Sequence, residues 1–419
     1  MIKYIQYIYK TYINKTMLTL LALGFSSGFP FLLVFGTLTL WLRQQGLALS
    51  LIGIFSLVKI PYSIKWLWSP LIDNTKIPLL YKMGRRRSWA VLIQICLFIS
   101  IFCMSCINPV KNTYIMAFFA CLTAFLSASQ DIVLDAYRVE CFTKNPQKQA
   151  NGVAIFILGY RLGLIYSGAG ALYLKALYNW NISYRIMAFG IFIGLFAMIL
   201  TNEAVQYKYK KFKNDIKEFL VISVIEPFKD FIKKEKWYWI LILIFTYHLS
   251  NAYFNPVINP FYNDIGFSEV EIANVMKLYG MIAAILGGIS GGLIINKIGL
   301  KKGLLYFGIL QCLSTMLFSL QAIYGHNMKL FILVVSMENF ISGLATTALV
   351  AYISSLCNKL YTATQYALLS SVMGASRDIF SSTSGLVAEY VSWELFFIIS
   401  SCMSIPAILI ILFYIKDDK

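Results

Sequence analysis

The chain has 419 residues, of which 59% are hydrophobic and 13% are charged, and its formal net charge is +17. Soluble domains carry about 25% charged residues, so this composition excludes a soluble globular protein and indicates a polytopic membrane protein. The positive charge does not indicate binding to nucleic acid, because no basic module with interleaved aromatic residues lies outside the apolar segments. We instead expect cytoplasmic loops that are rich in Lys and Arg.

In chain order, the apolar segments follow a Lys- and Tyr-rich strip over residues 1–15, which we expect at the membrane interface. The first segment lacks a signal-peptide cleavage motif, so we interpret it as a retained first helix. About twelve segments are long enough to span a bilayer. They lie near residues 17–41, 50–73, 88–107, 112–138, 150–174, 182–204, 237–262, 269–296, 303–325, 329–356, 364–390 and 393–415.

The segments form two groups of six around a central Lys-rich loop. The sequence therefore predicts an all-α membrane protein with about twelve transmembrane helices. Its expected parts are an N-terminal six-helix half over residues 1–204, a cytoplasmic basic linker over 205–236 and a C-terminal six-helix half over 237–419. Most of the 36 Lys and Arg residues lie on the side of this linker and both termini, and the positive-inside rule places that side in the cytoplasm.

The two halves resemble each other in sequence. Three identical pairs are separated by the same 216 residues: Cys141 and Cys357, Gln149 and Gln365, and Arg161 and Arg377. A basic cluster that begins at Gly84 also has a counterpart at Gly299, in the equivalent loop. Several matches in the same order argue for a duplicated six-helix unit.

Ionisable residues interrupt the fourth and fifth segments. Each costs about 2.5–3.5 kcal/mol inside a bilayer, so such groups usually pair, face a cavity and mark a transport path. Asp131 and Asp135 are four residues apart and share a helix face. Asp131 lies roughly 10 Å from the cytoplasmic end of its helix and Arg161 roughly 16 Å, so the two can pair if their helices are neighbours. The structural alternative is a permanent ion pair that fixes helix packing.

A carboxyl group beside an arginine and partly removed from water experiences two opposite effects on its protonation. We therefore interpret Asp131 and Asp135 as proton-coupling candidates, with Arg161 as the partner of Asp131 or as a substrate anchor. Asp135 is nearer the cytoplasmic mouth. It could instead pair with Arg138, or with the basic cluster, as the latch of a gate.

Several stretches resemble the AmpG-type muropeptide permeases of the major facilitator superfamily, and they cover most of the chain. They are GFSSGFPFLLVFGTLTLWL (24–42), FSLVKIPYSIKWLWSPLID (55–73), GRRRSW (84–89), ASQDIVLDAYR (128–138), LGYRLGLIYSG (158–168) and LCNKLYTATQYALLS (356–370). The resemblance implies a monomeric, proton-driven permease of the bacterial inner membrane that imports anhydro-muropeptides for peptidoglycan recycling by alternating access. Acetyl-CoA transporters are similar to this family, so another bulky anion is the alternative substrate.

In the superfamily, the loop between the second and third spans carries a glycine, an aspartate and a basic cluster, and the resemblance implies an inward-side gate there. The corresponding gating candidates are Asp73, Gly84, Arg85, Arg86 and Arg87, to which we add Arg138. The spacing from the aspartate to the glycine is longer here than in the usual motif. The basic charge alone is also explained by the positive-inside rule, as a topology anchor.

A muropeptide carries carboxylates, which arginine binds bidentately, and sugar rings, on which aromatic side chains stack. The substrate-binding candidates are Arg161, Arg377, Lys59, Lys277, Glu338, Asn339 and Tyr160. Glu338 is also a candidate to neutralise Arg377 in an empty site, or to be a second proton site. Packing is the alternative role for Tyr160. Lys65 lies closer to the cytoplasmic end, and we expect its side chain to snorkel.

The seventh segment carries a polar stripe beside two prolines. His248, Asn251 and Asn255 recur on one helix face, and Pro256 and Pro260 are expected to break or bend that helix. A polar stripe beside a bend fits a moving helix that faces a cavity. Hydrogen bonding between helices is the alternative.

The sequence contains no HExxH motif and no P-loop motif, and it predicts neither an enzyme nor direct use of ATP. The eight cysteines are scattered and only two histidines are present, so we expect no metal site and no cofactor. The expected partners are a small glycopeptide, protons and the lipid bilayer. A non-transporting membrane sensor or a channel is the alternative of a different class.

Overall fold

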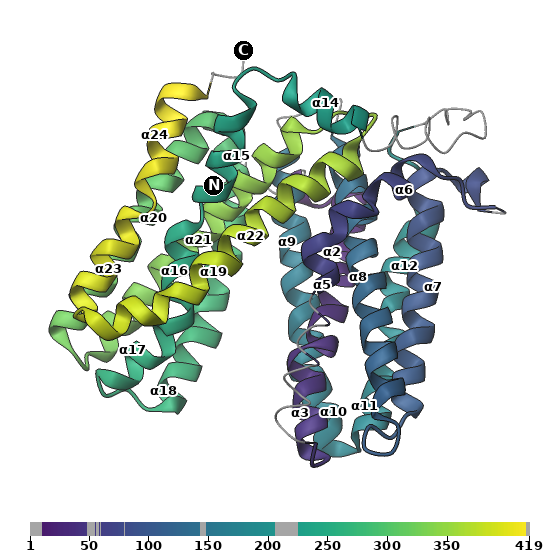
Figure 1. The fold of residues 1–419 in the computed structure, drawn as a ribbon, viewed down its shortest axis with the longest axis horizontal. Helices are drawn as coiled ribbons and strands as arrows, with labels where there is room; N and C mark the ends of the chain where they lie inside the picture. The colour runs from purple at the N-terminus through teal and green to yellow at the C-terminus, as the bar shows by residue number, and fades with distance from the viewer. Residues whose placement is uncertain are drawn as a thin grey trace. The chain divides into compact units, whose positions relative to one another are not determined.

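The computed structural model describes residues 11–47, 55, 58, 60–78, 80–142, 148–205 and 225–415, except the side chains of Glu269, Lys277 and Ser382. Every regular element in these ranges is helical (Figure 1). The chain divides into two compact units. Unit 1 consists of Met1–Lys144, Ile155–Phe228 and Cys357–Leu368, and unit 2 consists of Asn145–Ala154, Lys229–Leu356 and Leu369–Lys419.

The helices of unit 1 come mainly from the first half of the chain. The long ones are α2 (Lys15–Val34) with α3 (Gly36–Gln44), α7 (Arg85–Cys106), α8 (Thr113–Cys141), α9 (Gln149–Ile165) continued by η5 (Tyr166–Gly170) and α10 (Ala171–Leu177), and α11 (Trp180–Phe189) with α12 (Ile191–Leu200). Shorter pieces are α5 (Ile60–Ile64), η2 (Lys65–Leu67), α6 (Ser69–Asn74) and η3 (Tyr81–Met83). Helix α14 (Glu226–Ile232) lies within the linker 205–236, and its residues up to Phe228 belong to unit 1. The first six residues of α9, from Gln149 to Ala154, belong to unit 2, which includes Asn145–Ala154.

Unit 2 is built from the second half of the chain. Its elements are α15 (Trp237–Thr246), α16 (Leu249–Phe254), η7 (Asn255–Val257), α17 (Ile258–Asp264), α18 (Glu269–Asn274), η8 (Val275–Gly280), α19 (Met281–Ile298), α20 (Leu300–Tyr324), α21 (Met328–Leu356), α22 (Thr362–Tyr390), α23 (Trp393–Cys402) and α24 (Ile405–Tyr414). Helix α22 begins in unit 1, which includes Cys357–Leu368, and continues in unit 2.

Nine stretches of the described chain are long and apolar enough to cross a membrane. Three of the twelve expected spans are not among them, for three different reasons. The segment 50–73 lies partly outside the described residues, and the segment 237–262 is divided into short helices. Helix α22 is long, but Ser, Thr and charged residues lower its hydropathy.

The seventh span is interrupted where the prolines predict. Helix α16 ends at Phe254, a 3-10 turn covers Asn255–Val257, and α17 begins at Ile258. Pro256 lies in the turn and has no N–H to donate, so the regular α-helical hydrogen bonding cannot continue through it. The polar side chain of Asn251 lies on α16, one turn before this break, and points to the interior of the unit with an exposed fraction of 9%.

Glycines allow close contact between helix backbones in each unit. In unit 1, a Cβ atom on Gly24 or Gly28 of α2 would overlap the backbone of α9 at Phe156 or Tyr160. In unit 2, a Cβ atom on Gly287 of α19 would overlap the carbonyl oxygen of Phe340 on α21. Such contacts bring the polar residues of neighbouring membrane helices within reach of each other.

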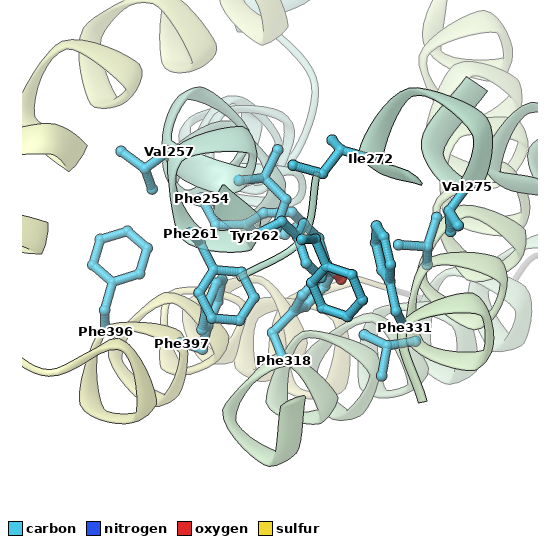
Figure 2. Close-up of a cluster of buried hydrophobic side chains, with 14 of the residues drawn as sticks. Phe254, Val257, Phe261, Tyr262, Ile272, Val275, Phe318, Phe331, Phe396 and Phe397 are labelled. Atoms are coloured by element: carbon cyan, nitrogen blue, oxygen red, sulfur yellow. The ribbon is translucent and has the colours of Figure 1, made fainter. Parts of the chain in front are cut away.

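An aromatic core occupies part of unit 2. Figure 2 shows Phe254, Phe261, Tyr262, Phe318 and Phe331 gathered in one buried cluster. The rings of Tyr262 and Phe331 are 3.9 Å apart between centroids, and those of Phe318 and Phe397 are stacked at 5.1 Å. The cluster joins α16 and α17 to α20, α21 and α23, so it holds the broken seventh span against the rest of the unit.

Candidate functional site

Asp131 lies on α8, which packs against α2. Ser27 of α2 donates a hydrogen bond from Oγ to Asp131 Oδ1 over 2.6 Å. Lys65 of η2 is a cation whose charge acts on Asp131, and Asp135 adds a like charge. No Lys or Arg in the described ranges forms an ion pair with Asp131. The carboxyl group is therefore held by a neutral hydroxyl, which can donate to it or accept from it as its protonation changes.

Arg161 of α9 is partly buried, and no described carboxylate lies within ion-pair distance of it. The structure thus does not join Asp131 and Arg161 as an ion pair. Helix α2 contacts both of their helices: Ser27 meets Asp131 on α8, and its neighbour Gly28 abuts the α9 backbone at Tyr160. Similar depth along two helices is not enough for pairing, because the rotation of each helix decides where its side chains point.

Tyr62 of α5 interacts electrostatically with both Asp131 and a second tyrosine, Tyr160 of α9. Its ring packs edge-on against Phe31, with centroids 5.4 Å apart, and its hydroxyl is buried. The structure therefore gathers the expected Asp131 and Tyr160 with Tyr62 and Lys65. The expectation that Lys65 only snorkels overlooked its effect on Asp131.

The gating candidates Asp73, Arg85 and Arg86 meet in a buried charge cluster that also includes Glu140, at the end of α8. Arg86 Nη2 lies 2.7 Å from Asp73 Oδ1 and 2.7 Å from Glu140 Oε1. Arg85 Nη2 lies 2.8 Å from Glu140 Oε1, and its Nη1 lies 3.7 Å from Asp73 Oδ1. Two arginines and two acids balance in charge, which is what allows them to be fully buried.

Gly84 and Arg87 have local roles at the beginning of α7. Gly84 has φ +109°, and a Cβ atom there would overlap the side chain of Glu203. Glu203 accepts hydrogen bonds from the backbone N–H groups of Arg86 over 2.7 Å and Arg87 over 3.1 Å, so it caps the helix. Arg87 donates from Nη2 to the Ile199 carbonyl over 2.8 Å, at the end of α12. Arg87 thus ties two helix ends together and is not part of the buried charge cluster.

Asp73 has a second role at the beginning of α22, within unit 1. Its Oδ2 accepts hydrogen bonds from both the backbone N–H and the hydroxyl of Thr364, each over 2.8 Å. A carboxylate at this position complements the partial positive charge of a helix N-terminus. Beside it, Tyr361 donates from its hydroxyl to Glu226 of α14 over 2.7 Å. The same carboxylate therefore joins α6, α7 and the first turn of α22.

Asp135 pairs with Arg138, one of the two partners expected for it. Arg138 Nη2 lies 3.2 Å from Asp135 Oδ1, and the guanidinium group packs over the rings of Phe156 and Tyr366, at 5.5 Å and 5.1 Å. Arg138 is fully buried, whereas the Asp135 side chain is 16% exposed. The pair is separate from the cluster of Arg85 and Arg86.

In unit 2, the candidates do not converge on one ion pair. Glu338 of α21 is buried and accepts hydrogen bonds from Asn251 and Gln311. Arg377 of α22 is exposed beside Asp378, with Nε 3.8 Å from Oδ1. Asn339 donates to the Val335 carbonyl of its own helix over 3.0 Å. Glu338 thus does not neutralise Arg377 here. Lys59 lies outside the described residues, as does the side chain of Lys277.

Sequence reasoning missed Glu140, Glu203 and Thr364. Glu140 ends an apolar segment two residues after Arg138, and this position was a usable signal for an acid that faces the Arg85 and Arg86 loop. Glu203 lies at the end of the sixth segment, 182–204, and nothing in its surroundings marks it as a helix cap for α7. Thr364 is hidden in a Thr- and Ser-containing stretch, and its partner Asp73 is far away in the sequence.

Residues 16–376 and 240–419 match the model of the Major Facilitator Superfamily. A relative from Rickettsia felis, named "Putative transporter AmpG 4", is 35% identical over 97% of this chain and 98% of its own length. Another from Rickettsia bellii, named "Putative transporter AmpG 1", is 36% identical over 93% of this chain and 95% of its own.

Solved structures share the fold at low identity. The proton:xylose symporter XylE matches with a TM-score of 0.69 at 12% identity, over 99% of this chain and 97% of that chain. The human organic anion transporter MFSD10 matches with a TM-score of 0.69 at 12% identity, over 96% and 99%. The sequence relatives are transporters by name and the fold is that of transporters, which indicates a transporter and not an enzyme. This chain is a membrane protein with about twelve transmembrane helices in two six-helix halves, and it belongs to the AmpG-type transporters of the major facilitator superfamily.

Proposed function

We propose that the protein is a proton-coupled secondary transporter that imports anhydro-muropeptides across the bacterial inner membrane. The AmpG names of relatives that match nearly the whole chain support this substrate. We infer that both termini and the linker 205–236 are cytoplasmic, because Lys and Arg are concentrated on their side. The carrier is a monomer whose halves, 1–204 and 237–419, rock around a site near the middle of the bilayer.

Proton coupling is proposed for Asp131, and the observation that carries it is that this carboxyl group is hydrogen-bonded to a neutral hydroxyl. Ser27 is its hydrogen-bond partner at 2.6 Å, and the described residues provide no ion pair that would keep it ionised. Lys65 and Asp135 act on Asp131 with charges of opposite sign, and alternating access to water on the two sides of the membrane would let this carboxyl group gain and lose a proton. Asp135 is ion-paired with Arg138 and acts with it nearer the mouth.

Substrate binding is proposed for the residues named from the sequence, led by Arg161. Its guanidinium group is partly buried without a described carboxylate, so it can bind a peptide carboxylate of the substrate bidentately. Tyr160 is the adjacent aromatic side chain for a sugar ring. Arg377, Asn339, Lys59 and Lys277 are the proposed contacts from the second half. The role of Glu338 is developed below.

Gating is proposed for the buried charge cluster. Asp73 holds the first turn of α22 through Thr364 while it pairs with Arg86, and Arg86 in turn holds Glu140 of α8. Release of Thr364 from Asp73 frees α22 without separating the two arginines from Glu140. We infer that this release accompanies the opening of the cytoplasmic side, with Gly84 and Arg87 keeping the end of α7 in place.

The test is uptake of labelled N-acetylglucosaminyl-anhydro-muropeptide into proteoliposomes, with and without an inward proton gradient. We expect saturable uptake that the gradient stimulates. The Asp131→Asn protein should bind the substrate but lose the stimulation. Asp264→Asn, at an exposed position of unit 2, is the control and should behave like the wild type.

Three results would contradict the proposal in different places. Uptake of acetyl-CoA or another bulky anion, without uptake of the muropeptide, would show that the substrate is that anion. Non-saturating uptake that scales with membrane potential would indicate a channel. Binding without any uptake would indicate a sensor.

A further inference from the structure

Glu338 is a buried carboxylate with neutral partners. It lies ten residues after the beginning of α21 at Met328, hence roughly 15 Å along the helix, and is 6% exposed. Asn251 Nδ2 donates to Glu338 Oε1 over 2.7 Å, and Gln311 Nε2 donates to the same oxygen over 3.3 Å. A carboxylate in such a position is costly when it is ionised, because no cation of the described residues pairs with it to offset its lost hydration.

The surroundings of Glu338 contain few groups that titrate. Helix α16 presents Asn251 and α20 presents Gln311, neither of which ionises, and α19 packs against α21 through glycine. Tyr262 of α17 interacts electrostatically with Glu338, and its hydroxyl is buried. No Lys, Arg or His in the described ranges pairs with Glu338. His248, at the beginning of α16, interacts with Arg377 instead. The side chain of Lys277, on η8, lies outside those ranges.

The two amide groups can serve both protonation states of Glu338. Asn251 Oδ1 and Gln311 Oε1 are buried and accept no hydrogen bond from the described residues. Rotation of an amide group by half a turn exchanges its NH₂ group and its carbonyl oxygen. The NH₂ group donates to the ionised carboxylate, and after rotation the carbonyl oxygen accepts from the protonated carboxyl group. The same three side chains thus satisfy Glu338 with and without a proton.

We propose that Glu338 is a second proton-binding site, in the unit that does not contain Asp131, and that it gains and loses a proton during transport. In this step a proton from water bonds to a carboxylate oxygen of Glu338 and later leaves the same oxygen for water, with no other bond changed. Its place in the transport cycle rests on the proposed function, whereas the titration of Glu338 does not. Glu338 is hydrogen-bonded to two amide groups, whereas the buried acids Asp73 and Glu140 are ion-paired with arginine. This difference distinguishes Glu338 from them.

The first experiment needs no substrate. Infrared difference spectra of the purified protein in detergent are recorded across a pH titration, to follow the carbonyl-stretch band of protonated carboxyl groups. We expect one band of the wild type to be absent from Glu338→Gln and shifted in frequency in Glu338→Asp. Asp131→Asn and Glu389→Gln, at an exposed position of α22, should both keep that band. Identical spectra of the wild type and both Glu338 variants would overturn the proposal.

The second experiment separates coupling from transport. Exchange of labelled muropeptide across proteoliposomes at equal pH requires no net proton movement, whereas accumulation against a gradient does. We expect the ratio of gradient-driven accumulation to exchange to be at least tenfold lower in Glu338→Gln than in the wild type, so that any weaker binding of the substrate, which lowers both rates, cancels. If the Glu338→Gln protein accumulates muropeptide as well as the wild type, the role of Glu338 in proton coupling is overturned. The same holds if a sodium gradient, and not a proton gradient, drives the accumulation. If the wild type fails to transport the muropeptide, the proposed function fails, and the infrared result alone decides whether Glu338 binds a proton.

Discussion

Buried charges are accommodated in opposite ways in two regions of the molecule. At the beginning of α7, Arg86 lies 2.7 Å from both Asp73 and Glu140, so each charge is compensated at contact distance. Among the described residues, Glu338 of unit 2 accepts hydrogen bonds only from two amide groups, and Arg161 of unit 1 has no carboxylate within ion-pair distance. The compensated cluster resists a change in protonation and suits a latch. The uncompensated groups remain available for a proton or for a substrate carboxylate.

The largest expected effect comes from breaking the compensated cluster. Arg86→Met removes the cation shared by Asp73 and Glu140 and leaves buried negative charge, which typically costs about 3–5 kcal/mol. Thermal unfolding of the detergent-solubilised protein measures the loss. Arg43→Met, at an exposed position of α3, is the control and should change stability by less than about 0.5 kcal/mol. Equal stability of the two variants would show that the cluster does not stabilise unit 1.

The beginnings of α7 and α20 can also be compared, because equivalent glycines occupy both positions. Gly84 and Gly299 have φ values of +109° and +86°, so alanine strains the backbone at both, typically by about 1–3 kcal/mol. Only at Gly84 would the new Cβ atom also overlap Glu203. Gly84→Ala should therefore lower the unfolding temperature more than Gly299→Ala. When Glu203→Ala is added to both variants, the difference between their unfolding temperatures should become smaller. A larger effect of Gly299→Ala than of Gly84→Ala would contradict the role of the contact with Glu203.

A smaller effect is expected from the contact between Asp73 and α22. Thr364→Val removes the hydroxyl donor but keeps the backbone N–H. It should therefore lower the free energy of unfolding by about 1.5–3 kcal/mol in the conformation in which Thr364 contacts Asp73. Thr383→Val, at an exposed position of the same helix, is the matched control. If the contact is a latch, protease cleavage or cysteine labelling near residue 364 should become faster. No change in accessibility together with normal stability would argue against the latch.

The smallest effect on stability is expected where the charge has no partner. Arg161→Met removes a partly buried cation that no described carboxylate compensates, so stability should change by less than about 0.5 kcal/mol or rise. Muropeptide binding should weaken strongly in the same variant, and Arg161→Lys should restore it only in part, because lysine cannot bind a carboxylate bidentately. A loss of stability as large as that of Arg86→Met would show that Arg161 is compensated after all.

Much of the fold follows from the sequence alone. Apolar runs of the required length predict the membrane helices, and Pro256 predicts the break in the seventh span, because proline cannot donate a helical hydrogen bond. Repeated residues at a constant offset predict two similar halves, because a duplicated unit keeps its internal spacing. The exception is the second expected span, 50–73, whose described part is divided into short elements between residues 60 and 74.

Local spacing also identified part of the site. Asp135 and Arg138 pair as neighbours on one helix face, because residues three apart are adjacent there. By contrast, Asp131 contacts Ser27 and not Arg161, since helix rotation and the glycines of α2 determine which side chains meet. The partners Glu140 and Thr364 of the buried cluster come from distant segments. The sequence by itself thus determined the helices and the types of charged group that the membrane must accommodate. Only the tertiary structure decided which of those charges are compensated, because pairing depends on contacts between helices that no local pattern contains.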